Sequence, residues 1–72
     1  YNMAIQKEVL QVEGMSCNHC KMAVETAVKK LPGLVVAEVD LAEKTLQVEY
    51  DGEKTSSAEI RQAVEDAGFE AR

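Results

Sequence analysis

The spacing of apolar residues changes repeatedly along these 72 residues, and the order of the patterns constrains the fold more than any other feature. Apolar and polar residues alternate over 8–13, which predicts a strand that ends at Gly14. From about Cys20 to Leu31 the apolar residues recur at helical spacing, and Pro32-Gly33 ends this predicted helix. The remaining predicted elements are strands over 34–41 and 46–50, a helix capped at Ser56 with an apolar stripe over 60–67, and a short strand within 69–72.

The resulting order is strand-helix-strand-strand-helix-strand. It predicts an α+β fold of the ferredoxin-like type, a βαββαβ sandwich in which an antiparallel four-stranded sheet carries two helices on one face. Ser56 and Glu59 fit a capping box, in which each side chain bonds a free backbone N–H at the start of the second helix. The other face of the sheet is expected to stay in water because its residues are polar: Lys7, Gln11, Glu38, Asp40, Gln47 and Glu49.

Length and composition predict a single domain over residues 1–72 with an aliphatic core. Hydrophobic residues make up 46% of the chain, and its two cysteines cannot supply a disulfide framework. Tyr1 and Asn2 precede Met3. We therefore expect either a native start at Met3 behind two added residues or a chain cut from a longer one.

The charge balance excludes some classes of partner. Eight basic and 13 acidic residues give a net charge of -5, and without a basic cluster this argues against nucleic acid and against direct membrane binding. No apolar run approaches the roughly 20 residues that span a bilayer, and no basic-then-apolar export signal is present. We therefore expect a cytoplasmic protein, where paired cysteines are more often metal-binding or catalytic than structural.

The candidate functional site is the segment Gly14-Met15-Ser16-Cys17-Asn18-His19-Cys20, which holds both cysteines at C-x-x-C spacing. Cys17 is expected in the loop after the first strand, and Cys20 in the opening turn of the first helix. Because a helix N-terminus favours an anion, we expect the Cys20 thiol to ionise readily, and thiolate is the form that binds metal. Two Cys and one His are too few for a four-ligand structural zinc site. Two thiolates suit Cu(I) and leave it open to an incoming third thiolate.

Two other uses of the cysteines stay open. A thiol-disulfide redox protein also places C-x-x-C at a helix start, although such proteins are usually longer and set a proline against the disulfide. Here the single proline, Pro32, lies at the far end of the predicted helix. The cysteines could instead merely fill space. A c-type haem site is excluded, because Lys21 follows the second cysteine where that site requires His.

The residues around the cysteines carry further expectations. His19 is expected to face solvent rather than to bind metal. Met15 is expected to pack inward as a flexible apolar side chain rather than to act as a thioether ligand. Gly14 is expected to supply a backbone conformation, or a close approach, that a side chain would block.

The segment Gly14-Met15-Ser16-Cys17-x-x-Cys20 resembles the G-M-x-C-x-x-C motif of heavy-metal-associated domains. The resemblance covers the whole chain and includes Leu31-Pro32-Gly33-Leu34 after the first helix and Ala67-Gly68-Phe69 after the second. Within that family the chain is most similar to bacterial cytosolic copper chaperones. It is nearly as similar to the N-terminal metal-binding domains of copper P-type ATPases.

The resemblance implies a copper carrier rather than an enzyme. Cys17 and Cys20 would bind Cu(I) and pass it by thiolate exchange to a partner domain of similar fold, such as one in a copper-transporting P-type ATPase. Met15 would support the loop from below, and Phe69 would shield the site. Ser16 stands where zinc- and cadmium-transporting relatives often have an acidic residue, which favours Cu(I). Phe69 is frequent in ATPase domains, so an ATPase regulatory domain is the alternative, and the sequence leaves open whether copper induces a homodimer.

Overall fold

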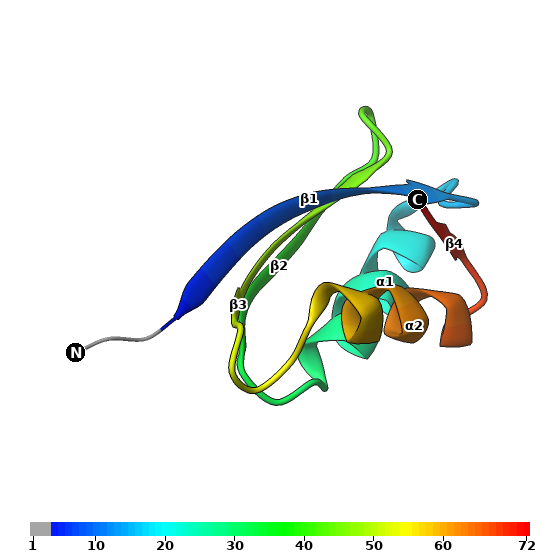
Figure 1. Cartoon of the computed structure of the whole chain (residues 1–72). Helices are drawn as coiled ribbons and strands as arrows, with labels where there is room; N and C mark the ends of the chain where they lie inside the picture. The colour runs from blue at the N-terminus through cyan, green and yellow to red at the C-terminus, as the bar shows by residue number, and fades with distance from the viewer. Residues whose placement is uncertain (1–3) are drawn as a thin grey trace.

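The computed structural model describes residues 4–72, and Figure 1 shows its elements in the predicted order. Tyr1, Asn2 and the expected start at Met3 lie outside the described residues. The elements are β1 (Ile5–Glu13), α1 (Asn18–Lys29), β2 (Leu34–Asp40), β3 (Thr45–Asp51), α2 (Ser57–Asp66) and β4 (Glu70–Ala71). The βαββαβ order that the sequence predicts is confirmed.

The strands form one antiparallel sheet in the order β2-β3-β1-β4, and both helices lie on one of its faces (Figure 1). β1 begins at Ile5, three residues before the predicted start, because β3 pairs along it until Ile5 lies opposite Asp51. The short β4 pairs with the last residues of β1, where Glu13 lies opposite Glu70. The end of the chain therefore returns to the point where β1 enters the C-x-x-C loop.

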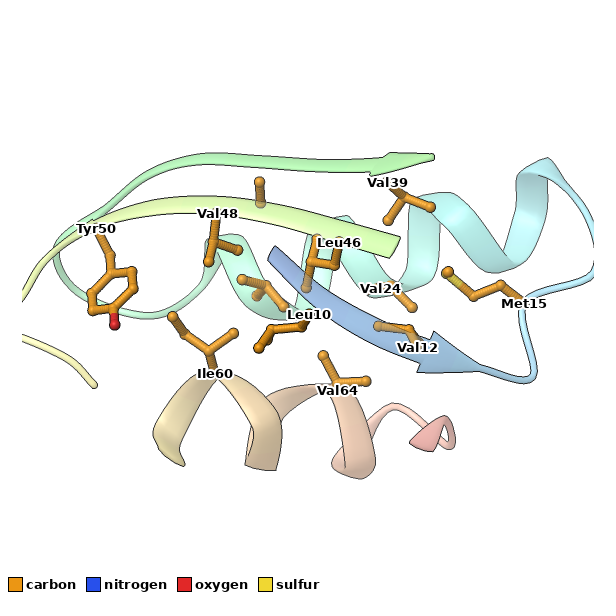
Figure 2. Packing of buried hydrophobic residues seen from close by; sticks show 12 residues of the cluster. Leu10, Val12, Met15, Val24, Val39, Leu46, Val48, Tyr50, Ile60 and Val64 are labelled. Atoms are coloured by element: carbon orange, nitrogen blue, oxygen red, sulfur yellow. The ribbon is translucent and has the colours of Figure 1, made fainter. Parts of the chain in front are cut away.

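The hydrophobic core lies between the sheet and the two helices (Figure 2). Fully burying one aliphatic side chain stabilises the fold by roughly 1.5–3 kcal/mol, so these residues provide most of the hydrophobic stabilisation. The buried apolar residues are Leu10, Val12, Met15, Val24, Val28, Ala37, Val39, Leu46, Val48, Tyr50, Ile60 and Val64. The opposite face of the sheet carries the predicted polar side chains, which are exposed or half-buried, and the exposed Val9 joins them.

Helix α1 begins and ends two residues earlier than the sequence pattern predicts. Cys17 is its N-cap, with an extended backbone, and the Lys21 N–H donates the first helical bond to the Cys17 carbonyl at 3.1 Å. The side chain of Cys17 makes no capping hydrogen bond. At the other end Lys30 is the C-cap. Within residues 4–72, neither helix is long and apolar enough to cross a membrane.

The start of α2 follows half of the predicted capping box. Ser56 is the N-cap, and its hydroxyl oxygen accepts the Glu59 backbone N–H at 3.3 Å, as predicted. The Glu59 carboxylate does not return to the N-cap N–H. It accepts the hydroxyl of the buried Thr55 at 2.6 Å instead, because that hydroxyl would otherwise lack a partner inside the fold.

The end of α2 is a Schellman motif centred on Gly68, which has a φ of +97°. The Gly68 N–H donates to the Glu65 carbonyl, and the Phe69 N–H donates to the Val64 carbonyl. Gly68 therefore occupies the C′ position of the helix. The turn also fixes the direction in which the chain leaves the helix, and it brings Phe69 back toward β1.

Candidate metal centre

The loop from Gly14 to Cys17 connects β1 to α1 and begins with a residue in the left-handed region. Gly14 has a φ of +99°, which other residues adopt only at a cost. A Cβ at Gly14 would lie 3.5 Å from Cδ2 of Phe69. The expected special backbone conformation of Gly14 is therefore confirmed, whereas the contact with Phe69 is an ordinary one that a Cβ could make.

Met15 anchors this loop to the core. Its side chain is only 8% exposed and packs with the buried cluster, at the end of that cluster nearest the loop (Figure 2). The inward packing is what the sequence predicts for an unbranched apolar side chain at this position. Its support of a metal-binding loop stays a prediction.

Cys17 and Cys20 lie close together but differ in exposure. Cys17 is exposed, and Cys20 is half-buried and packs against the core. Their Sγ atoms are 3.9 Å apart, and both thiols are free. Thiolate sulfurs bind an ion such as zinc at about 2.3 Å, so two sulfurs on one ion of that size lie at most about 4.6 Å apart. The observed separation therefore lets one soft ion contact both sulfurs with little movement of the chain.

The thiol of Cys20 has a lowered pKa, as the sequence predicts, but the principal cause differs from the expected one. Hydrogen bonding from the backbone of Ser16 contributes most to the lower pKa, followed by the Ser16 side chain. Partial burial acts in the opposite direction, and Cys17 adds smaller favourable hydrogen bonds. The Ser16 Oγ lies 3.9 Å from the Cys20 Sγ. Ser16 is therefore part of the site through contacts that the sequence alone did not show.

The other candidate residues lie outside the sulfur pair. His19 is exposed on the first turn of α1, as expected of a residue that faces solvent. Lys21 is half-buried. Within residues 4–72, no group of three or more His, Cys, Asp or Glu side chains is arranged to hold a metal ion. The local donor set is therefore the two sulfurs.

Phe69 is half-buried beside the loop and packs against the core. Its ring reaches Gly14 because α2 ends in the Gly68 turn and β4 pairs with the end of β1. The aromatic ring therefore lies beside the start of the loop that follows β1. Its shielding of a bound ion stays a prediction.

The fold and the dithiol loop together define a small α+β domain with two adjacent free thiols, one exposed and one half-buried. The heavy-metal-associated domain family matches residues 9–70, most of the chain. This chain therefore belongs to the heavy-metal-associated domain family.

Individual relatives resemble it over nearly their whole length. A copper chaperone CopZ from Staphylococcus haemolyticus (strain JCSC1435) is 45% identical over 65 residues, which cover 90% of this chain and 96% of that protein. The structure of a CopZ metallochaperone matches with a TM-score of 0.90 and 40% identity, covering 93% of this chain and all of that one. The N-terminal domain of a potential copper-translocating P-type ATPase from Bacillus subtilis, in its Cu(I)-loaded state, matches with a TM-score of 0.90 and 29% identity. That match covers 94% of this chain and 85% of the ATPase domain.

Proposed function

We propose that this protein is a cytoplasmic copper chaperone that binds one Cu(I) between Cys17 and Cys20 and is not an enzyme. The observation that carries the proposal is the pair of free sulfurs 3.9 Å apart at the start of α1. Soft thiolates select Cu(I), and a two-sulfur site leaves the ion accessible. The relatives named copper chaperone CopZ and CopZ metallochaperone support this assignment, because the match covers nearly the whole length of each.

The unequal exposure of the sulfurs suggests how the ion leaves. Cys20 packs against the core and has a lowered pKa, so its thiolate holds the ion from the protein side. Cys17 is exposed, so a thiolate of a partner domain can reach the ion beside it. The incoming thiol loses its proton as its sulfur bonds to the ion, the bond to Cys17 breaks, and the freed Cys17 thiolate takes up a proton in its place. No change in the oxidation state of copper is needed.

The partner we propose is a metal-binding domain of similar fold in a copper-transporting P-type ATPase. Mixing the Cu(I)-loaded protein with such a domain in its copper-free form, then separating the two by ion exchange, measures transfer. We expect copper to distribute between both proteins within the time of mixing. A partner whose own C-x-x-C cysteines are replaced by Ser is the control and should receive none. Copper that stays wholly on this chain with an intact partner would contradict the proposal.

A second candidate function is that of a metal-binding regulatory domain within a copper ATPase. The structural match to the Bacillus subtilis ATPase domain and the aromatic side chain of Phe69 favour it. The length of the reading frame separates the two candidates. A stop codon soon after Arg72 indicates a free-standing chaperone, and a continuing frame with membrane spans indicates the ATPase domain.

A thiol-disulfide redox function makes different predictions for the same two cysteines. A redox protein would catalyse the reduction of insulin by dithiothreitol, whereas a metal carrier should not exceed the uncatalysed rate. We expect no catalysis by this chain.

A further inference from the structure

A groove runs between α1 and α2, separate from the two sulfurs. Its volume is about 660 Å³, and neither cysteine lines it. Small side chains, among them Ala23, Ala27 and Ala63, leave space between the helices. Two larger side chains from the first turns of α1, His19 and Met22, also line the groove.

Met22 is not among the residues that form the core or pack against it. Its side chain is 62% exposed, whereas Met15 is 8% exposed and fills a place in the core. An exposed thioether is free to change rotamer and to present its sulfur to the groove. The two methionines therefore differ in what their sulfur atoms can reach.

His19 and Met22 are placed to act together. They are three residues apart in α1, and side chains at this spacing are neighbours on a helix surface, with Cβ atoms about 5–6 Å apart. Both side chains border the same groove. An imidazole nitrogen and a thioether sulfur can therefore approach one point from adjacent turns.

The donors determine which ions fit. A thioether is a soft ligand that selects ions such as Cu(I), and an imidazole also binds copper well. Neither donor is charged when the imidazole is neutral, which suits a monovalent ion better than a divalent one. Lys30 also borders the groove, but it is eight residues beyond Met22, about 12 Å along the helix axis. Asp66 lines the α2 side and contributes a negative charge.

We propose that His19 and Met22 form a second, weaker site for soft monovalent ions, Cu(I) or Ag(I), on the face of α1 that borders the groove. This site does not depend on Cys17 or Cys20. It would hold an ion beside the helix start when the two sulfurs are occupied or absent.

Titration with Ag(I) in chloride-free buffer tests this site, with the Cys17→Ser/Cys20→Ser protein as the sample. We expect the methyl resonance of Met22 and the ring resonances of His19 to shift together, saturating at one ion per chain. The buried Met15 methyl serves as an internal reference and should barely move. Met22→Leu and His19→Gln should each weaken binding by about tenfold, which is about 1.4 kcal/mol. Thr26→Ala, a groove residue without a soft donor, should leave the affinity unchanged.

If the double-serine protein is unfolded, the wild-type protein provides the same test. One equivalent of Ag(I) fills the thiolates first, and the second equivalent should then shift Met22 and His19. The proposal would be overturned if the His19 ring resonances shifted while the Met22 methyl resonance did not. It would also be overturned if Met22→Leu left the Ag(I) affinity unchanged. Because the resonances of Met22 and His19 report on the groove and not on the thiols, a negative result would leave the proposed copper site between Cys17 and Cys20 untouched.

Discussion

At the residue scale, the environment of the Cys20 sulfur is set chiefly by the residue four positions before it. The backbone and the hydroxyl of Ser16 both hydrogen-bond to this sulfur and lower the pKa of the thiol. A lower pKa means that the thiolate persists to lower pH. Because protons compete with metal for the same sulfur, copper binding should then also persist to lower pH.

Replacing Ser16 by Ala tests this arrangement. The pKa of Cys20 should rise only part of the way to its ordinary value, because the larger backbone contribution remains. The ultraviolet absorbance of the thiolate, followed against pH, measures the change, and apparent Cu(I) affinity in mildly acidic buffer should fall with it. Ser16→Thr keeps a hydroxyl and is the control. A Cys20 pKa equal in wild type and Ser16→Ala would show that the hydroxyl has no such effect.

Phe69 is the second residue whose effect we expect to be local. Its ring packs beside Gly14 at the entrance to the dithiol loop. Phe69→Ala should speed the oxidation of the thiols, because water and oxidant reach them more easily, while copper stoichiometry stays at one. Removing a buried Phe costs about 3–5 kcal/mol, and the half-buried Phe69 should cost less.

The rate of loss of free thiols under air measures this effect, once global unfolding of each variant has been measured separately. Phe69→Leu retains apolar bulk and should behave more like the wild type. Equal oxidation rates in all three proteins would limit Phe69 to a packing role.

At the scale of single elements, the end of α2 controls where Phe69 lies. Gly68 holds a φ of +97°, and a Cβ there would meet nothing within 4 Å. Substitution at this position therefore costs backbone strain rather than a steric clash. The Schellman motif links this one conformation to the position of the aromatic ring.

Gly68→Ala should lower the free energy of unfolding by about 1–2 kcal/mol, the cost of a left-handed conformation for an L-residue. Gly68→Asn should cost less, because Asn tolerates that conformation, and it serves as the matched control. Urea denaturation measures both. Equal losses for Ala and Asn would point to a cause other than backbone strain.

At the scale of the whole molecule, a polar network joins three elements at the end of the core far from the dithiol loop. Figure 2 shows Tyr50 and Met15 at opposite ends of the buried cluster. The Tyr50 hydroxyl donates to the Glu8 carboxylate at 3.1 Å, and Ser57 donates to the same carboxylate at 3.0 Å. Arg61 lies 3.6 Å from it. This network ties α2 to β1 and β3.

The network predicts a specific pH dependence of stability. Burial raises the pKa of Tyr50 above its ordinary value of 10.0, with a further contribution from Glu8. The folded state therefore favours the protonated phenol, and its contribution to stability is complete below pH 10. It is lost as pH rises from there toward the raised pKa, because the unfolded chain ionises first. Unfolding free energies from neutral to alkaline pH should fall more steeply for wild type than for Tyr50→Phe, and equal slopes would contradict this account.

The order of elements and most of the core could be predicted from sequence because they depend on local periodicity. The alternation that ends at Gly14 and the helical spacing of Val24 and Val28 are properties of neighbouring residues. The start of α1 was predicted two residues late because Cys17 caps the helix through its backbone alone, without the side-chain bond that marks a usual N-cap.

Contacts between distant residues could not be predicted in the same way. The Glu25 carboxylate accepts the backbone N–H of Val39 on the edge strand, fourteen residues away. Tyr50 meets Glu8 across 42 residues. Such pairs depend on the register of strands and on helix orientation, which a pattern of neighbours does not contain. At the site, the C-x-x-C spacing alone indicates that the two cysteines converge. The contribution of Ser16 to the pKa of Cys20 depends on how the loop folds, which the spacing does not show.

The most direct test of the central claim is competition for Cu(I) between the reduced protein and a Cu(I)-selective chelator. The account predicts one Cu(I) per chain and a strong preference for Cu(I) over Zn(II). Cys17→Ser and Cys20→Ser should each lower the Cu(I) affinity by more than about 10–100-fold. A loss of that size is typical when only an outer-shell partner of a metal ligand is removed. Tight binding retained by Cys17→Ser, or by Cys20→Ser, would contradict the account.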